Sequence, residues 1–177
     1  YGAALQGGEA TLPPMESFAD HALAEASQSA QSATATERYW QGRFVNGAPV
    51  LDLPIDLPRP AHRRFASRRE DLELSPDLLH ALRETAARQG CSLFSLMLSA
   101  FALLIARLAG QDDVVIGIPS AGQPASGKLA MVGHCANTLP MRFTPDRNET
   151  FPAFLKRAND DLLDAVEHRD YTLSTLL

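Results

Sequence analysis

The sequence has few cysteines, no excess of positive charge and no secretory signal. Its 177 residues include two cysteines, Cys91 and Cys135, and no CxxC pair. Two cysteines are too few for a disulfide scaffold, so both are predicted to be reduced thiols of an intracellular protein. The formal net charge is -5 and the isoelectric point is near 5.5. This balance argues against nucleic-acid binding as the main task.

Targeting and metal-binding patterns are also lacking. The first residues, YGAALQGGEATLPP, contain neither a basic nor an apolar segment, so no signal peptide is predicted. The chain does not begin with methionine, which indicates a piece of a longer protein. No metal site is expected, because the histidines show neither HxxxH nor Cys–His ligand spacing; they are His21, His62, His80, His134 and His168.

The residues that are present are typical of a soluble domain with a core, with 45% hydrophobic and 21% charged residues. A first helix is predicted from about residue 17 to residue 26. The polar stretch 28–35 is predicted to be a flexible link, and Thr36 to begin a short helix. Residues 48–60 contain four prolines, so they are predicted to run extended across a surface.

The rest of the chain alternates between predicted strands and helices, which indicates the α/β class. Strands are predicted near the end of residues 63–74, over VVIGIP at 114–119, and over about 135–143. Ser75 is predicted to begin a helix that ends before Gly90, and Thr150 to begin the last helix.

Residues 92–109 are apolar on nearly every face of a helix and end at Gly110. A membrane span is the alternative interpretation, since about 20 apolar residues cross a bilayer. Three serines and Arg107 interrupt the run. We therefore predict a fully buried core helix.

The segment 131–142, MVGHCANTLPMR, gathers reactive-looking side chains. A Cys–His pair can supply a nucleophile, but neighbours on a strand point to opposite faces. His134 and Cys135 are therefore predicted to place one side chain in the core and the other on a surface or cleft wall, and not to act as a catalytic couple.

Residues 118–122, IPSAG, nearly match the GxSxG nucleophile elbow of hydrolases. Ile118 replaces the first glycine, and the following QPASG is not a helix start. A strand that runs into a tight turn is the preferred interpretation. A hydrolase with Ser120 as nucleophile is the alternative.

Taken in order, five segments resemble the condensation domains of nonribosomal peptide synthetases. They are YGAALQGGEATLPPMESFADHAL, YWQGRFVNGAPVLDLPIDLPRP, SLFSLMLSAFALLIARLAGQDDVVIGIPSAGQ, MVGHCANTLPMR and EHRDYTLSTLL. The fourth is similar to the family's I-G-x-F-V-N-T-L-P-L-R motif and the fifth to its H-x-D-Y-P motif. The resemblance covers nearly the whole chain, and the G-H-C form is similar to members of hybrid polyketide–peptide assembly lines.

The resemblance implies a chloramphenicol-acetyltransferase-like α/β lobe with a mixed β-sheet and packed helices. It places residues 1–60 at the end of an N-terminal lobe and its crossover, and residues 61–177 in an incomplete C-terminal lobe. The family joins a donor acyl or peptidyl thioester to an acceptor aminoacyl thioester, both on carrier proteins, through an amide. Its catalytic His-His-x-x-x-Asp-Gly motif does not occur in this sequence. The piece is therefore expected to be inactive alone.

The resemblance also implies a cleft that phosphopantetheine arms of carrier proteins enter. Small residues there let a thin arm pass close to the backbone, and the amide of Asn137 reaches a substrate carbonyl or a neighbouring backbone group. The residues expected to line the cleft are Gly117, Ser120, Ala121, Gly122, Gly133, His134 and Asn137.

The implied partners are the donor and acceptor carrier proteins, the rest of the condensation domain and the neighbouring synthetase domains. No directly bound cofactor, nucleic acid or membrane is expected, and the predicted location is the cytoplasm. A non-catalytic condensation-like domain that docks a carrier protein or tailoring enzyme is one alternative, and an ester-forming acyltransferase is another. The isolated piece is expected to expose apolar patches.

Overall fold

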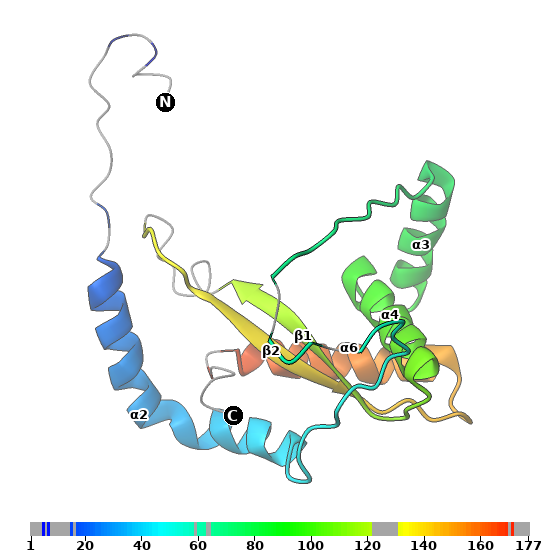
Figure 1. Ribbon diagram of the computed structural model, residues 1–177. Helices are drawn as coiled ribbons and strands as arrows, with labels where there is room; N and C mark the ends of the chain where they lie inside the picture. The colour runs from blue at the N-terminus through cyan, green and yellow to red at the C-terminus, as the bar shows by residue number, and fades with distance from the viewer. Residues whose placement is uncertain are drawn as a thin grey trace. The chain divides into compact units, whose positions relative to one another are not determined.

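A computed structural model describes residues 5, 7, 15, 17–58, 60–62, 65–121, 131–169 and 171. The elements in chain order are α2 (Phe18–Arg43), α3 (Pro76–Arg88), α4 (Leu93–Ala109), β1 (Val114–Ala121), β2 (Ala136–Phe143) and α6 (Phe151–Glu167) (Figure 1). The strands β1 and β2 are hydrogen-bonded neighbours and run antiparallel. Helices combined with a sheet confirm the predicted α/β class.

The chain divides into two compact units, each built from separated stretches of sequence. Unit 1 comprises Tyr1–Val45, Gly117–Leu139 and His168–Leu177, and unit 2 comprises Asn46–Ile116 and Pro140–Glu167. Both strands pass from one unit to the other. The lobe boundary near residue 60 is a different kind of division and stays a prediction.

Residues 18–43 form one continuous helix, so the prediction of two helices joined by a flexible link is wrong. The backbone of residues 28–35 is helical throughout. That stretch, QSAQSATA, contains no glycine or proline, and none of its residues costs a helix much more than about 0.7 kcal/mol relative to alanine. Ser17 begins the helix by accepting a hydrogen bond from the backbone N–H of Asp20 at 3.3 Å.

Unit 2 is built around α4, which packs against α6 and α3. Small side chains let the neighbouring helix approach closely. The two buried serines are satisfied, because Ser99 Oγ donates to the carbonyl of Ser95 at 2.7 Å and Ser95 Oγ is hydrogen-bonded to Ser92 Oγ at 2.9 Å. The buried residues of α4 are Ser95, Leu96, Leu98, Ser99, Ala102 and Ala106. Gly110 ends the helix in the left-handed region with φ of 65°.

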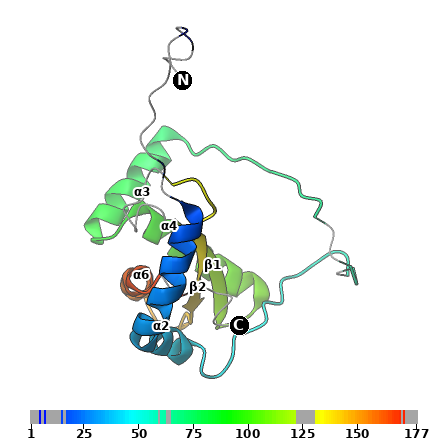
Figure 2. The same cartoon turned by 90° about the vertical axis from the view of Figure 1, so that its left-hand side faces the viewer.

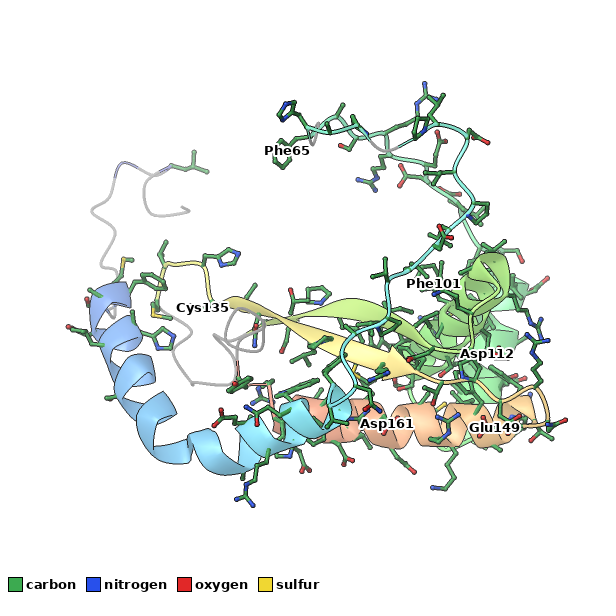
Figure 3. All side chains as sticks on the ribbon, turned by 60° about the horizontal axis from the view of Figure 1, so that its bottom comes forward. Phe65, Phe101, Asp112, Cys135, Glu149 and Asp161 are labelled. Carbon is green, nitrogen blue, oxygen red and sulfur yellow. The ribbon has the colours of Figure 1, made fainter. Side chains whose placement is uncertain are left out.

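The opposite face of α4 carries an exposed apolar stripe, and the prediction of a fully buried helix is wrong for this chain. The residues of the stripe are 42–53% exposed and recur at helical spacing: Phe94, Met97, Phe101, Leu104 and Leu108. Figure 3 labels one of them, Phe101. Apolar residues on every face predict neighbours on every face, whereas the main packing partners of α4 in the described residues are α3 and α6. The stripe confirms the expected apolar patches.

No single helix among the described residues is long and apolar enough to cross a bilayer. The helices α3 and α4 have the length and apolar composition of a span only when they are counted as one segment, and the two are bent by 99° relative to each other.

Residues 65–75 are extended but form no strand, so the strand predicted near 63–74 is wrong within the described residues. Figure 2 shows the segment as a long trace that leads into α3. Leu72, one of its alternating leucines, is 87% exposed. Alternation predicts a pleated, half-buried surface, but a strand also needs a hydrogen-bonded neighbour, and in this part of the structure β1 and β2 pair only with each other.

The tight packing around Ala102 gives a first testable prediction. Ala102 is fully buried, so Ala102→Leu forces extra methyl groups against α6 or α3 and is expected to lower the free energy of unfolding by about 1–3 kcal/mol. Urea unfolding followed by circular dichroism measures the change. Ala100 is exposed on the same helix, and Ala100→Leu is expected to stay within about 0.5 kcal/mol of the original protein. Equal effects of the two substitutions would contradict the packing described here.

Candidate functional site

Six of the seven residues predicted to line a cleft are described, and all six lie in unit 1. Gly117, Ser120 and Ala121 belong to β1, Gly133 and His134 precede β2, and Asn137 lies in β2. Gly122 lies outside the described residues. Ser120 and Asn137 are half-buried and the other four are exposed.

Gly117 lies against Thr138 of the neighbouring strand. A Cβ atom at position 117 would be 3.0 Å from Cγ2 of Thr138, closer than ordinary van der Waals contact. The absence of a side chain at Gly117 therefore serves the pairing of β1 with β2, in addition to leaving backbone accessible.

Ser120 lies inside β1 and not on a strand-to-helix turn. No histidine of the described ranges forms a hydrogen bond with its hydroxyl. Both features of a nucleophile elbow, the sharp turn and the nearby base, are thus missing from the described geometry. This arrangement favours the strand interpretation over the hydrolase.

His134 and Cys135 both precede β2, which begins at Ala136. His134 is exposed, Cys135 is half-buried, and no hydrogen bond joins them in the part of the chain that the structure describes. The other cysteine, Cys91, packs against the apolar cluster of Ala86, Leu96 and Leu155. Burial raises the pKa of the Cys91 thiol, so its reactive thiolate form is disfavoured.

Asn137 uses its whole side-chain amide on backbone groups. Its Nδ2 donates to the carbonyls of Arg169 at 2.7 Å and Tyr171 at 2.9 Å, and its Oδ1 accepts from the N–H of Thr138 at 2.8 Å. Of the two roles considered for this amide, the structure shows bonding to a neighbouring backbone. Asn137 fixes the chain that follows α6.

Trp40 of α2 holds the same segment and was not among the predicted site residues. The Trp40 side chain is 1% exposed, and its Nε1 donates to the carbonyl of His168 at 2.8 Å. We call this arrangement the carbonyl clasp: the side-chain N–H groups of Trp40 and Asn137 bound to the carbonyls of His168, Arg169 and Tyr171. It satisfies three carbonyls just beyond the end of α6, where no helical partner remains.

The His168 side chain is held by α2 as well. Its ring stacks on that of Tyr39 with centroids 4.2 Å apart and planes 28° apart, and its Nδ1 lies 3.2 Å from Oγ1 of Thr36. The sequence contains one signal for the bond between Trp40 and the His168 carbonyl: a buried tryptophan needs a hydrogen-bond partner for its N–H. The identity of that partner was not readable from a single sequence, because 128 residues separate the two.

Unit 2 contains a different set of side-chain ties. Arg142 pairs with Asp113 through two bonds of 2.6 and 2.9 Å, and these hydrogen bonds raise the pKa of Arg142. Its Nη1 also donates to the carbonyl of Gly47 at 3.3 Å. Gln111 accepts from the N–H of Asp52 and donates to the carbonyl of Val50, both at 2.9 Å. These contacts fix the start of the proline-rich segment.

Unit 2 also has a cavity of about 440 Å³ between the end of α4 and the start of α6. Its floor is apolar, with Ala106 and Phe154 buried, and its rim carries both signs of charge, with Arg107, Arg147 and Asp112 among the lining residues. None of the six described residues of the predicted cleft lines it. In the described ranges no group of three or more His, Cys, Asp or Glu residues is placed to hold a metal ion.

Comparison with known proteins shows the family of this chain. The family model "Condensation domain" matches residues 1–177. Tyrocidine synthase 2 of Brevibacillus parabrevis is 37% identical over 141 residues, which are 80% of this chain and 4% of that protein. The chain belongs to the condensation-domain family of nonribosomal peptide synthetases. The resemblance recognised in the sequence is therefore confirmed.

Solved structures show the same fold. The condensation domain from Monacolin K polyketide synthase MokA matches 99% of this chain and 42% of its own, with a TM-score of 0.77 and 25% identity. The X-domain in its complex with OxyB from teicoplanin biosynthesis matches 97% of this chain and 39% of its own, with a TM-score of 0.80 and 24% identity. The chain thus spans less than half the length of each of these two solved chains.

Proposed function

We propose that this chain supplies one wall of a condensation cleft in which two carrier-bound substrates are joined by an amide. The amine nitrogen of the acceptor attacks the carbonyl carbon of the donor thioester, a C–N bond forms, the C–S bond breaks, and the donor thiol leaves as the amine loses a proton. The match of the Condensation domain family to residues 1–177 carries the proposal.

Such a reaction needs two tethered substrates to be aligned and one proton to be moved. The exposed Gly117 and Ala121 of unit 1 leave backbone accessible, which suits the thin phosphopantetheine arm of a carrier protein. The His-His-x-x-x-Asp-Gly motif does not occur in the sequence. We therefore propose that residues 1–177 shape the cleft and do not catalyse amide formation by themselves.

A docking domain without catalysis is the second candidate. Its support is the fold likeness to the X-domain that was solved in complex with OxyB, with a TM-score of 0.80. At 24% identity this likeness concerns the fold alone, whereas the 37% identity with tyrocidine synthase 2 extends to the sequence. Amide formation is therefore the function that the observations favour.

The test uses the intact protein that contains this chain, with donor and acceptor carriers loaded as thioesters. We expect mass spectrometry to detect an amide on the acceptor carrier, and no amide when residues 1–177 replace the intact protein. An ester in place of an amide would identify the ester-forming acyltransferase. Binding of a carrier without any product would favour the docking domain. Unchanged product formation in the Ser120→Ala variant would rule out the hydrolase, because that enzyme needs the Ser120 hydroxyl as its nucleophile.

A further inference from the structure

The start of α2 touches the segment that leads into β2. Phe18 is the first residue of α2, and its ring lies directly over Gly133. A Cβ atom at position 133 would overlap Cδ2 of that ring and lie 2.7 and 2.8 Å from its Cε2 and Cγ. Figures 1 and 3 show this segment, which includes Cys135, beside the start of α2. Both elements belong to unit 1.

The overlap cannot be relieved by a turn of the phenyl ring. Cγ lies on the axis of rotation about the Cβ–Cγ bond, so it stays in place when the ring turns. A change of χ1, a shift of the helix start or a shift of the backbone at Gly133 is needed to make room, and Ser17 fixes the helix start by capping the N–H of Asp20. Gly133 is not among the glycines with positive φ. The approach of Phe18, and not backbone strain, is what requires a glycine here.

The short segment from Gly133 to Asn137 is therefore held at both ends. Phe18 contacts it at Gly133, and the carbonyl clasp holds it at Asn137. The exposed His134 lies between these two contacts. Since the segment spans five residues, its fixed ends restrict the backbone from which the His134 side chain projects.

We propose that Phe18 and Gly133 are positioning residues for the proposed condensation reaction. Their contact sets the spacing between α2 and residues 133–136, and thereby the place of His134 in the cleft wall. This inference rests on the proposed function, because it concerns the same cleft. It adds to that function a steric requirement on two residues that are 115 positions apart (133 minus 18). Neither residue contacts the substrates; both act by holding the cleft wall in place.

The experiment is a cycle of substitutions in the intact protein, assayed with loaded carriers. Gly133→Ala is expected to lower kcat about tenfold, since a small displacement of a positioning group has effects of this order or larger. Phe18→Ala removes the ring that the new methyl group meets, so adding Gly133→Ala in that background is expected to change kcat less than about twofold. The KM for the acceptor carrier is expected to stay within about twofold, because carrier docking does not involve this contact.

Gly42→Ala is the matched control, because a Cβ at position 42 meets nothing within 4 Å. It is expected to leave kcat unchanged and not to lower the thermal midpoint, because Gly42 lies in α2 and alanine favours a helix over glycine. An unchanged kcat for Gly133→Ala, or the same loss in both backgrounds, would overturn the inference. If Gly133→Ala alone does not fold, recovery of folded enzyme in the double variant supports the contact, and failure to recover overturns it.

The inference and the proposed function fail differently. No amide from the unsubstituted intact protein would sink the proposed function. In that case the contact is still tested by stability: the effect of Gly133→Ala on the thermal midpoint is compared with and without Phe18→Ala. Amide formation that ignores the Gly133 substitution would leave the function standing and remove the inference.

Discussion

Replacing Trp40 by alanine is expected to lower the free energy of unfolding by about 3–5 kcal/mol, the range for a buried tryptophan. The indole is almost completely buried and packs edge-to-face against Tyr39, with centroids 5.0 Å apart and planes 83° apart. Its Nε1 also satisfies the carbonyl of His168. Trp40→Ala therefore leaves a cavity in unit 1 and an unpaired carbonyl, and both effects destabilise the folded state.

Urea unfolding followed by far-ultraviolet circular dichroism measures this loss, since the substitution removes the only tryptophan and its fluorescence. Trp40→Phe keeps most of the ring but no N–H donor, and is expected to cost about 1–3 kcal/mol. Leu23 is 71% exposed on the same helix, and Leu23→Ala is expected to cost less than about 0.5 kcal/mol. Similar losses for Trp40→Ala and Leu23→Ala would contradict the contacts assigned to the indole.

The elements that were predicted correctly are those with local signals. Ser75 precedes Pro76 and caps α3 by accepting the N–H of Leu78 at 3.3 Å, and Gly110 ends α4. A continuous apolar run predicted β1, and β2 begins one residue later than predicted. Capping residues and hydrophobic runs act within a few residues of themselves, so a single sequence displays them.

The errors concern features that depend on distant neighbours or on weak preferences. The polar composition of residues 28–35 predicts a flexible link, although no residue in that stretch breaks a helix. The alternation ending at Leu74 predicted a strand, but pairing requires a second strand that no local pattern identifies. The apolar faces of α4 predicted burial, but which faces are covered depends on where α3 and α6 pack.

The candidate site shows the same limit. Residue types and their family resemblance singled out Gly133 and Asn137, yet their contacts lie far away in the sequence. Asn137 binds carbonyls 32 and 34 residues later in the sequence. Gly133 is constrained by Phe18, which lies in a different stretch of the sequence of unit 1. A single sequence records that a glycine or an asparagine is present, but it does not record which distant backbone or ring makes that residue necessary.

Asn137→Asp is the second substitution with a large expected effect. It keeps the shape of the side chain but replaces the Nδ2 donor by an oxygen that faces the carbonyls of Arg169 and Tyr171. Together the two carbonyls lose their shared donor group at a cost of about 1–3 kcal/mol, and an ionised carboxylate adds repulsion. We expect a total loss of about 2–4 kcal/mol in the free energy of unfolding at neutral pH, where the carboxylate is charged.

The loss is also expected to depend on pH, which separates charge from lost hydrogen bonds. The facing carbonyls disfavour the ionised form, so the pKa of the introduced carboxyl is raised in the folded state above its unfolded value of about 3.9. The variant is therefore least destabilised below that value, and its deficit grows as the pH rises through the raised folded pKa. Asparagine does not titrate, so the unsubstituted protein provides the reference at each pH.

Two further variants make the interpretation specific. Asn137→Ala removes the donors without adding charge, so its deficit of about 1–3 kcal/mol relative to the unsubstituted protein is expected to be the same at every pH. Asn46→Asp places the same new charge at an exposed position and is expected to change stability by less than about 0.5 kcal/mol. An Asn137→Asp deficit that is no larger at neutral pH than at pH values below the carboxyl pKa would show that the introduced oxygen does not face the two carbonyls. The carbonyl clasp would then be wrong.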